Sequence, residues 1–284
     1  MKRRSLLSIT WVLLAGLALG GCAKASAADQ GGKDAAKEQE EKTEIIYGKA
    51  AGPYTVLFED AIVPILEKQG YTLTCYEFSD LLQNDTALNE GDIDVNVEQH
   101  TAYMKNFNES QSGNLTAISP IPTVPAAIFS DTHKSLEEIS KNGKIAVPND
   151  ASNTARAYVL LQKAGWITLK SDVDPAAVTQ DDIVENPYEL EFVEMDSNNI
   201  PRVLGDFDYA VITGSIVYSS GIDASTALLQ ESILEHLILQ VVVKSENADS
   251  KWAKAIADAY HSDEFKKYME ENNKGLWFVP EELK

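Results

Sequence analysis

Hydrophobic and polar positions follow two different periods along this chain, and the two periods alternate from residue 43 onward. Ile93, Val95 and Val97 alternate with polar residues, which is the period of a strand with one polar face. Over residues 54–69 the apolar positions recur at helical spacing, and Pro64 predicts that this helix is kinked or split. The same patterns predict strands at residues 44–48, 73–78, 93–98, 144–147, 191–193, 209–212 and 237–243, and helices at residues 54–69, 81–90, 101–108, 153–164 and 250–272.

Strands that alternate with helices indicate an α/β architecture in which helices cover both faces of each sheet. In such sheets ligands bind outside the carboxyl ends of the strands. Three of the predicted strands run into polar loops, at residues 49–53, 148–152 and 213–216. We therefore expect these three loops to form the functional site.

The N-terminus has the pattern of a secretory signal. A basic start at residues 2–4 precedes an apolar run that ends in small residues before Cys22. This is the bacterial lipobox pattern, in which a diacylglycerol on the Cys22 thiol holds the protein at the membrane. A transmembrane anchor is the alternative, and the run is short for spanning a bilayer. We predict a signal peptide at residues 1–21 and a flexible, lipid-anchored linker at residues 22–42.

Composition narrows the choice of partners. The formal net charge is −20, and the predicted signal removes only positive charges. An acidic surface repels phosphate backbones and anionic membranes, so we expect no nucleic-acid partner and no membrane contact besides the lipid. With Cys22 lipidated, Cys75 has no cysteine partner, which excludes an intrachain disulfide and a cysteine-based metal site and favours a buried, inert thiol.

The clearest candidate chemistry lies at residues 147–156. There a strand ends, a polar loop turns, and a helix begins with Asp150 or Ser152 as its cap. Free N–H groups at a helix start, together with Arg156, form a site for a small anion such as a carboxylate. The alternative is that Arg156 pairs with one of the many acidic residues, and the sequence leaves both open.

A second candidate lies at the end of the strand predicted over residues 93–98. Glu98 and His100 continue its polar face, and Tyr103 follows in the next helix. No pair of the four histidines has metal-ligand spacing, so we predict no metal site. The nucleophile-elbow, phosphate-loop and zinc-protease motifs are absent from the sequence, so we predict neither enzyme activity nor a cofactor.

Several short motifs are spread from residue 43 to the end of the chain. They are Ala51-Gly52-Pro53, the segment from Tyr76 to Asp80, Asp94-Val95-Asn96 with Gln99-His100, Pro148-Asn149-Asp150 with Ser152-Asn153 and Arg156, the segment from Asp182 to Pro187, Ile200-Pro201-Arg202, and Ser262-Asp263-Glu264. In this order and spacing they resemble the methionine-binding lipoprotein family MetQ/NlpA. The resemblance implies a two-lobed periplasmic-binding-protein fold of type 2, with a hinge and a ligand cleft between the lobes. It also implies that an amino acid or small peptide is delivered to an ABC permease and its ATPase.

The resemblance implies roles for single residues of this chain. Arg156 stands at the position of the family's arginine that binds the ligand carboxylate, and Asn153 lies beside it. His100 and Tyr103 stand where the family lines the cleft from the other lobe. The resemblance therefore predicts that the two candidate regions meet in one cleft.

The chain departs from the family where methionine would be held. Leu81 replaces an aromatic residue, Glu98 replaces a phenylalanine, and Thr213 and Ser215 stand within the segment where the family has Asn-x-Asn-Tyr. A charged Glu98 in a cleft costs several kcal/mol unless it is paired, so it either meets a ligand cation or points to solvent. We therefore expect the ligand to be a polar or cationic amino acid or a short peptide, with methionine as one candidate.

These inferences predict a monomeric, lipid-anchored substrate-binding protein on the extracytoplasmic face of the cell membrane. One lobe is expected to comprise residues 43–124 and 241–284, and the other residues 125–240. The hinge is expected near residues 122–125 and Gln240. The alternative function is that of a surface lipoprotein, a sensor or an adhesin, that keeps the binding-protein fold without serving a permease.

Overall fold

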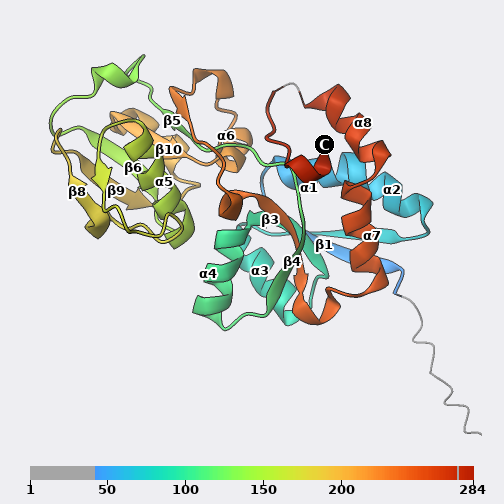
Figure 1. Cartoon of the computed structure of the whole chain (residues 1–284). Helices are drawn as coiled ribbons and strands as arrows, with labels where there is room; N and C mark the ends of the chain where they lie inside the picture. Colours follow the sequence, from blue (N-terminus) through green and yellow to red (C-terminus); the bar gives the residue numbers. More distant parts are fainter. Residues whose placement is uncertain (1–41, 274) are drawn as a thin grey trace, which may run out of the picture. The chain divides into compact units, whose positions relative to one another are not determined.

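Figure 1 shows the computed structural model of the chain, which describes residues 42–273 and 275–284 within one compact unit. The predicted signal peptide, Cys22 and the linker up to residue 41 lie outside the described residues. No helix among the described residues has the length and apolar character needed to cross a membrane. Two five-stranded sheets organise the unit, and we call the parts built on them the first and the second lobe.

The sheet of the first lobe consists, in spatial order, of β2 (Thr72–Glu77), β1 (Glu44–Lys49), β3 (Val95–His100), β12 (Leu239–Lys244) and β4 (Leu115–Pro120). β1 pairs in parallel with β2 and β3, whereas β12 runs antiparallel to β3 and β4. A late segment of the chain therefore lies inside a sheet whose other strands come from the first half of the sequence. Cys75 on β2 is partly buried rather than fully buried as predicted.

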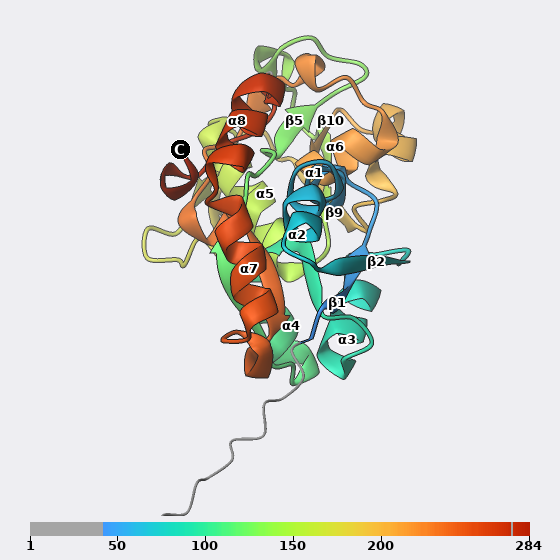
Figure 2. The same cartoon turned by 90° about the vertical axis from the view of Figure 1, so that its right-hand side faces the viewer.

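Helices cover both faces of this sheet. They are α1 (Pro53–Leu57), α2 (Val63–Lys68), α3 (Leu81–Glu90), α4 (Thr101–Gln111), α7 (Lys251–Tyr260) and α8 (Asp263–Asn272). Val241 and Val243 of β12 face a core formed with α1, α2, α7 and α8, and Figure 2 shows α7 and α2 in front of the sheet. Val242 faces a smaller core formed with α3 and α4. Each such buried side chain stabilises the fold by about 1.5–3 kcal/mol.

The helix predicted over residues 54–69 forms with an interruption. α1 continues into a π-helical turn, Phe58–Ile62, before α2 begins. Pro64 has no N–H to donate, and its ring crowds the carbonyl one turn earlier. The wider π turn directly before α2 accommodates both effects, so the predicted split near Pro64 is confirmed.

The prediction of one continuous helix over residues 250–272 is wrong. α7 ends at Tyr260 and α8 begins at Asp263. Between them the Ser262 hydroxyl accepts a hydrogen bond from Phe265 N at 3.2 Å, a cap that stabilises a helix start by about 1 kcal/mol. Both helices face the same core, so the apolar spacing continues across the break and conceals it in the sequence.

The sheet of the second lobe consists, in spatial order, of β11 (Leu229–Gln230), β5 (Ala127–Phe129), β10 (Tyr209–Ile212), β6 (Lys144–Pro148) and β9 (Glu191–Met195). β6 runs parallel to β9 and β10, and β5 runs antiparallel to β10 and β11. The sequence pattern predicted the three mutually parallel strands, β6, β9 and β10, but missed β5 and β11, which are too short to show a period. A separate hairpin pairs β7 (Thr168–Leu169) with β8 (Ile183–Glu185).

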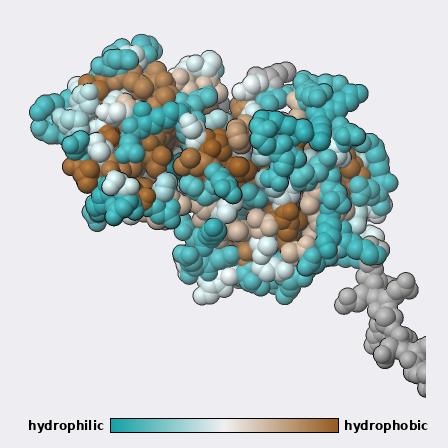
Figure 3. All heavy atoms as spheres, in the orientation of Figure 1, coloured by the Kyte–Doolittle hydropathy of each residue, from teal (hydrophilic) through white to brown (hydrophobic). Residues whose placement is uncertain are grey.

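The second sheet is also buried on both faces. Ile145 and Val147 of β6 pack with α5 (Ala151–Lys163), whereas Ala146 packs on the side of α6 (Gly214–Ser220). On the face drawn in Figure 3, hydrophobic residues gather over this lobe and hydrophilic residues cover more of the first lobe. Both sheets therefore have the two-faced burial that the α/β prediction requires.

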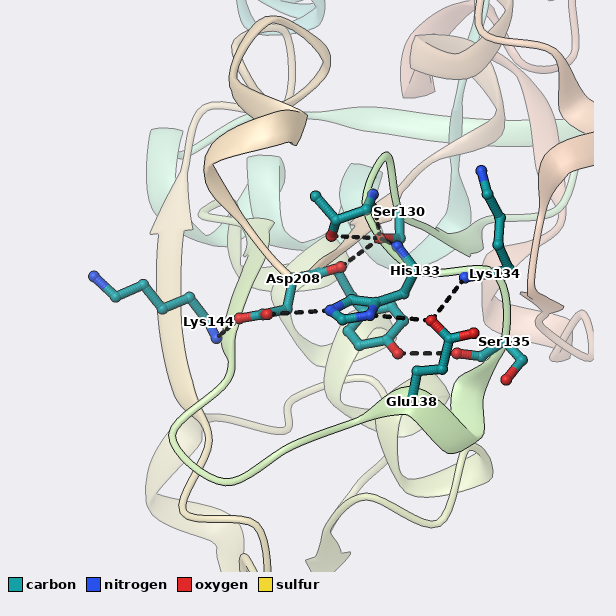
Figure 4. Close-up of polar contacts among 9 residues, drawn as sticks. Ser130, His133, Lys134, Ser135, Glu138, Lys144 and Asp208 are labelled. Carbon is teal, nitrogen blue, oxygen red and sulfur yellow. Dashed lines mark hydrogen bonds and ion pairs between the residues drawn. The ribbon is translucent and has the colours of Figure 1, made fainter.

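A polar cluster fixes the loop that follows β5. The His133 ring lies between two carboxylates, with Nε2 at 3.2 Å from Asp208 and Nδ1 at 3.2 Å from Glu138 (Figure 4). The ring stacks on that of Tyr209, with 4.9 Å between centroids. Ser130 Oγ donates to the Asp208 carbonyl oxygen at 2.6 Å and accepts from His133 N. The cluster joins this loop to β10, so its evident role is structural.

Two segments connect the lobes. We call residues 121–126, between β4 and β5, the first connection, and residues 231–238, between β11 and β12, the second connection. Gln240, which was expected at the second crossover, pairs with Gln99 of β3 and Pro120 of β4 inside the first sheet. Gln240 therefore belongs to strand β12 and not to the second connection.

A buried polar network joins β3 to α3. Asn96 Nδ2 donates to Asp85 Oδ1 at 2.7 Å, and Gln99 Nε2 donates to the same oxygen. Asp85 Oδ2 has no hydrogen-bond partner in the described part of the chain. Burial raises the pKa of Asp85 from its usual 3.8 to about 7, although both amide donors oppose the shift. The carboxyl group is therefore largely uncharged below neutral pH.

The Asp85 network predicts how stability depends on pH. An acid whose pKa is higher in the folded than in the unfolded chain favours folding most when protonated, so its contribution declines as pH rises from about 4 to about 7. Asp85→Asn keeps the accepting oxygen without the charge, and we expect it to remove this decline and to stabilise the chain at about pH 8 by about 1–3 kcal/mol. Urea unfolding across this pH range measures the difference. The exposed Asp92→Asn is the control, and an unaltered pH dependence in Asp85→Asn would contradict the prediction.

Candidate ligand-binding cleft

Residues from both lobes line a small inner cavity of about 60 Å³. The first lobe contributes the ends of β3 and the starts of α3 and α4, and the second lobe contributes α5 and the start of α6. All the ligand-binding residues predicted from the sequence line this cavity: Leu81, Glu98, His100, Tyr103, Asn153, Arg156, Thr213 and Ser215. The structure thus brings together segments that are far apart in the sequence.

A larger outer cavity of about 360 Å³ adjoins the inner one. The three loops expected at the functional site all contribute to it, through residues such as Ala51, Asp150 and Ser215. Both cavities are lined by Glu98 and Tyr103, so we treat them as one cleft with an inner and an outer part. Three further carboxylates, those of Asp80, Asp150 and Asp196, belong to residues that line the outer part.

The start of α5 is closed to an external anion. The Asp150 carboxylate caps this helix, accepting hydrogen bonds from Asn153 N and from Ser152 Oγ, each at 3.0 Å. It also accepts from Asn153 Nδ2. Asp150 therefore occupies the position at the helix start where the sequence analysis expected a bound anion. Arg156, the other part of that predicted anion site, does line the cleft.

Arg156 forms a two-point ion pair that the sequence did not identify. Its Nε donates to Glu231 Oε2 at 2.7 Å, and its Nη2 donates to Glu231 Oε1. The side chains are 4% and 6% exposed, so both charges are withdrawn from water. Burial lowers the pKa of Arg156, but Glu231 more than offsets this effect, so the pKa is raised and the guanidinium stays charged. The structure shows the pairing with an acid that the sequence left open, and it also places Arg156 in the wall of the cleft, where binding of a carboxylate stays a prediction.

The other edge of the guanidinium borders the inner cavity and has no acid beside it. Glu231 occupies the edge formed by Nε and Nη2, which leaves the edge formed by Nη1 and Nη2. Among the described residues, that second edge makes one long contact, from Nη1 to Asn153 Oδ1 at 3.4 Å. A carboxylate oxygen is a stronger acceptor than an amide oxygen and can replace this contact.

His100 links the two lobes as a neutral ring. Its Nδ1 accepts a hydrogen bond from Tyr103 N at 3.1 Å, so the ring proton lies on Nε2, which contacts Asn153 Oδ1 at 3.3 Å. Burial, and then the positive charge of Arg156, lower the pKa of His100 to about 3. The Asn153 amide oxygen thus accepts from donors on both sides of the cleft. His100 Nε2–H is a second donor for an acidic ligand.

Glu98 presents a buried carboxylate to both parts of the cleft. It is 8% exposed, which excludes the alternative that it points to solvent. Burial raises its pKa from 4.5 to about 7, while hydrogen bonds from the Thr55 hydroxyl and from the backbone of Thr55 and Ala50 oppose this shift. The positive charge of Lys49 also lowers the pKa of Glu98, but the Lys49 ammonium pairs directly with the Glu59 carboxylate at 2.8 Å.

The remaining wall contains residues that the sequence analysis did not single out. Tyr54, Gln99 and Leu239 line the inner cavity, as does Gly214 of the predicted loop 213–216. The Tyr54 hydroxyl accepts a hydrogen bond from Val124 N at 3.2 Å, which ties the wall to the first connection. A Cβ on Gly214 would lie 2.5 Å from Val124 Cγ1, so the backbone of α6 approaches that connection as only glycine allows. A glycine after a strand was the available signal, but it did not reveal this close contact.

Comparison with known proteins identifies the family of this chain. The family model described as NlpA lipoprotein matches residues 45–280 of this chain. The D-methionine-binding lipoprotein MetQ of Escherichia coli K12 is 31% identical over 255 residues, which cover 89% of each chain.

Solved structures show the same fold. A putative lipoprotein from Ruminococcus gnavus is 36% identical with a TM-score of 0.79, and the match covers 84% of this chain and 100% of that one. A nutrient-binding protein from Burkholderia cenocepacia bound to methionine is 32% identical with a TM-score of 0.77, covering 83% of this chain and 99% of that one. The two-lobed periplasmic-binding-protein fold predicted from the sequence is confirmed.

The geometry at His100 predicts that its ring does not titrate in the usual range. We expect the proton to stay on Nε2, with no second proton added down to about pH 5, because burial and Arg156 both disfavour the imidazolium. Nitrogen NMR shifts of the histidine rings measure this directly, and His100→Gln identifies the signal. The ring of His236, which is only partly buried, provides an internal comparison for the nitrogen shifts of His100. A midpoint for His100 near 6.5 would contradict the proposed environment.

Proposed function

Because the chain belongs to the NlpA lipoprotein family, we propose that it is the substrate-binding protein of an ABC importer and holds an amino acid or a short peptide in the cleft. The relatives that support this proposal include a D-methionine-binding lipoprotein and a nutrient-binding protein bound to methionine. The observation that carries it is the pairing of a buried cationic edge, on Arg156, with a buried carboxylate, on Glu98, across one cavity. These two groups match the two ends of an amino acid.

The ligand carboxylate binds at the Nη1–Nη2 edge of Arg156. His100 Nε2–H lies on the opposite lobe and donates a second hydrogen bond to the same group. Asn153 Oδ1, which receives contacts of 3.3 and 3.4 Å from these donors, marks the place that a carboxylate oxygen takes. Both contacts are long, so their replacement by charge-assisted bonds of normal length favours binding.

The ligand ammonium binds at Glu98. Glu231 already neutralises Arg156, so the inner cleft has an excess negative charge whenever Glu98 is ionised. A zwitterionic ligand leaves that excess in place, whereas a ligand with a further positive charge removes it. This balance favours a cationic or polar amino acid over methionine, and it agrees with the replacement of aromatic lining by Leu81, Thr213 and Ser215.

Ligand contacts from both lobes favour their closure about the hinge. The first and second connections are the segments that can bend, and the cleft lies between the lobes they join. The ligand shifts the lobes toward the closed arrangement only through its higher affinity for that arrangement. The inner cavity takes the charged head of the ligand, and the larger outer cavity takes the rest.

The lipid on Cys22 keeps the protein at the extracytoplasmic face of the cell membrane, where its partners are an ABC permease and its ATPase. The protein acts as a monomer, since one chain supplies both lobes of the cleft. Residues 22–42 provide the linker between the anchor and the folded unit. Cys22→Ser releases the protein from the membrane fraction while ligand binding in solution is retained.

The first test of the proposed function is calorimetry with a panel of amino acids and dipeptides. Arg156→Ala is expected to weaken binding of the preferred ligand about 10- to 100-fold, which is the worth of about 1.5–3 kcal/mol for a charged hydrogen bond. Arg202→Ala, on an exposed arginine, is the matched control and leaves affinity unchanged. Thermal unfolding confirms that each variant is folded. Unchanged affinity in a folded Arg156→Ala would remove this residue from the site.

The second test follows the proton on Glu98. Its pKa is about 7 without ligand, and an ammonium beside it lowers that value. Binding at about pH 6 therefore releases up to one proton, and affinity falls as pH drops below about 7, by up to tenfold per unit. Calorimetry in buffers of different ionisation enthalpy measures the number of protons released on binding.

Glu98→Gln is the control for this second test. It keeps the shape of the side chain and abolishes the proton release. Proton uptake, or a release that persists in Glu98→Gln, would contradict the proposed ammonium site. Tight binding of methionine with no preference for polar or cationic ligands would contradict the proposed selectivity.

A further inference from the structure

Glu231 holds more than the guanidinium of Arg156. The Glu231 side-chain Oε1 accepts a hydrogen bond from Ala126 N at 2.7 Å, and the Glu231 backbone N donates to the Ala126 carbonyl oxygen at 3.0 Å. Glu231 is thus joined to Ala126 in both directions. Oε1 is shared between Ala126 and Arg156, so the three residues form one continuous cluster.

This cluster lies where both connections enter the second lobe. Ala126 is the last residue of the first connection, directly before β5, and Glu231 is the first residue of the second connection, directly after β11. The ligand-facing guanidinium is therefore fixed to the two segments about which the lobes move.

The other ends of the connections are joined without charges. Ile121 N donates to the Leu239 carbonyl oxygen at 2.8 Å, and Leu239 N donates to Thr123 Oγ1 at 2.9 Å. Between the two clamped ends lie Val124 and Pro125 in the first connection and residues 232–238 in the second. These short stretches are the parts of the connections that can bend, and at one end of them Glu231 binds Arg156 of α5.

We propose that Glu231 is a positioning residue for ligand capture: it occupies the Nε–Nη2 edge of Arg156, points the Nη1–Nη2 edge into the cleft, and fixes that edge to both connections. The inference rests on the proposed function for its ligand, but the orientation of Arg156 is a property of the ligand-free protein. A ligand carboxylate on the open edge is then held in a fixed position relative to the hinge.

If the ion pair between Arg156 and Glu231 served only to stabilise the fold, a different result would be expected. Buried pairs of that kind stabilise a fold little and can be replaced by apolar residues without loss of function. A positioning role requires the carboxylate itself on one particular edge of the guanidinium. Removing the Glu231 side chain should therefore free the arginine to rotate, and a small carboxylate added to the solution should hold it again.

The experiment uses Glu231→Ala in the full chain, with formate as the added carboxylate. Proton–nitrogen correlation spectra of the arginine Nε–H groups report whether the guanidinium is held, and Arg156→Lys identifies the Arg156 signal. In the wild type we expect a sharp Arg156 signal because Nε–H is buried and bonded to Glu231. In Glu231→Ala the signal should broaden or vanish, and formate, but not chloride, should restore it.

Ligand affinity gives the second readout. We expect Glu231→Ala to bind the preferred amino acid at least about tenfold more weakly, since it loses the orientation of a charged hydrogen bond, and formate should recover part of the loss. Glu235→Ala is the matched control, because Glu235 is an exposed acid on the same connection. It should leave both the Nε–H signal and the affinity unchanged. Glu231→Gln, which keeps an accepting oxygen, should be affected less than Glu231→Ala.

The outcomes separate this inference from the proposed function. A sharp Arg156 signal in a folded Glu231→Ala, or a lost signal that formate does not restore, would overturn the positioning role. The same holds if Glu231→Ala binds as tightly as the wild type. If the wild type binds no member of the panel, the proposed function fails, while the Nε–H signal still decides whether Glu231 orients Arg156.

Discussion

A charged guanidinium withdrawn from water must have an anion beside it, and the arrangement of this cleft depends on that constraint. Arg156 is satisfied by Glu231 on one edge, and the other edge has no acid beside it and borders the inner cavity. Two neutralised charges alone would make a structural pair. In the proposed function the second edge receives a ligand carboxylate, and the cost of burying the guanidinium is met by Glu231 before any ligand arrives.

The other polar groups of the cleft divide by charge. His100 is held neutral by burial and by the nearby arginine, so it donates one proton from a fixed nitrogen without adding positive charge. The pKa of Glu98 is about 7 because burial disfavours its charge and outweighs the hydrogen bonds and the charge of Lys49 that oppose this effect. The cleft therefore combines one fixed cation, one neutral donor and one adjustable anion, and an amino acid complements all three.

Much of this arrangement could be predicted from local sequence patterns. The period of two at Ile93 to Val97, the loop before Arg156 and the spacing of the family motifs located the strands, the loops and the residues of the cleft. Glu231 could not be found in this way, because its partner lies 75 residues away and nothing in its neighbours distinguishes it from other acidic residues. The break at Ser262 was hidden for a related reason, since helices on both sides of it bury the same core.

The position of β12 bears on the order in which the two lobes can be completed as the chain is synthesised. The second lobe is formed by one uninterrupted stretch, whereas the first sheet has a gap between β3 and β4 until β12 fills it. β3 carries Glu98 and His100, so the strand that bears these two residues lacks its neighbour β12 until nearly the whole polypeptide has been synthesised. The wall that the first lobe contributes to the cleft is thus complete only when the C-terminal part of the chain has been added.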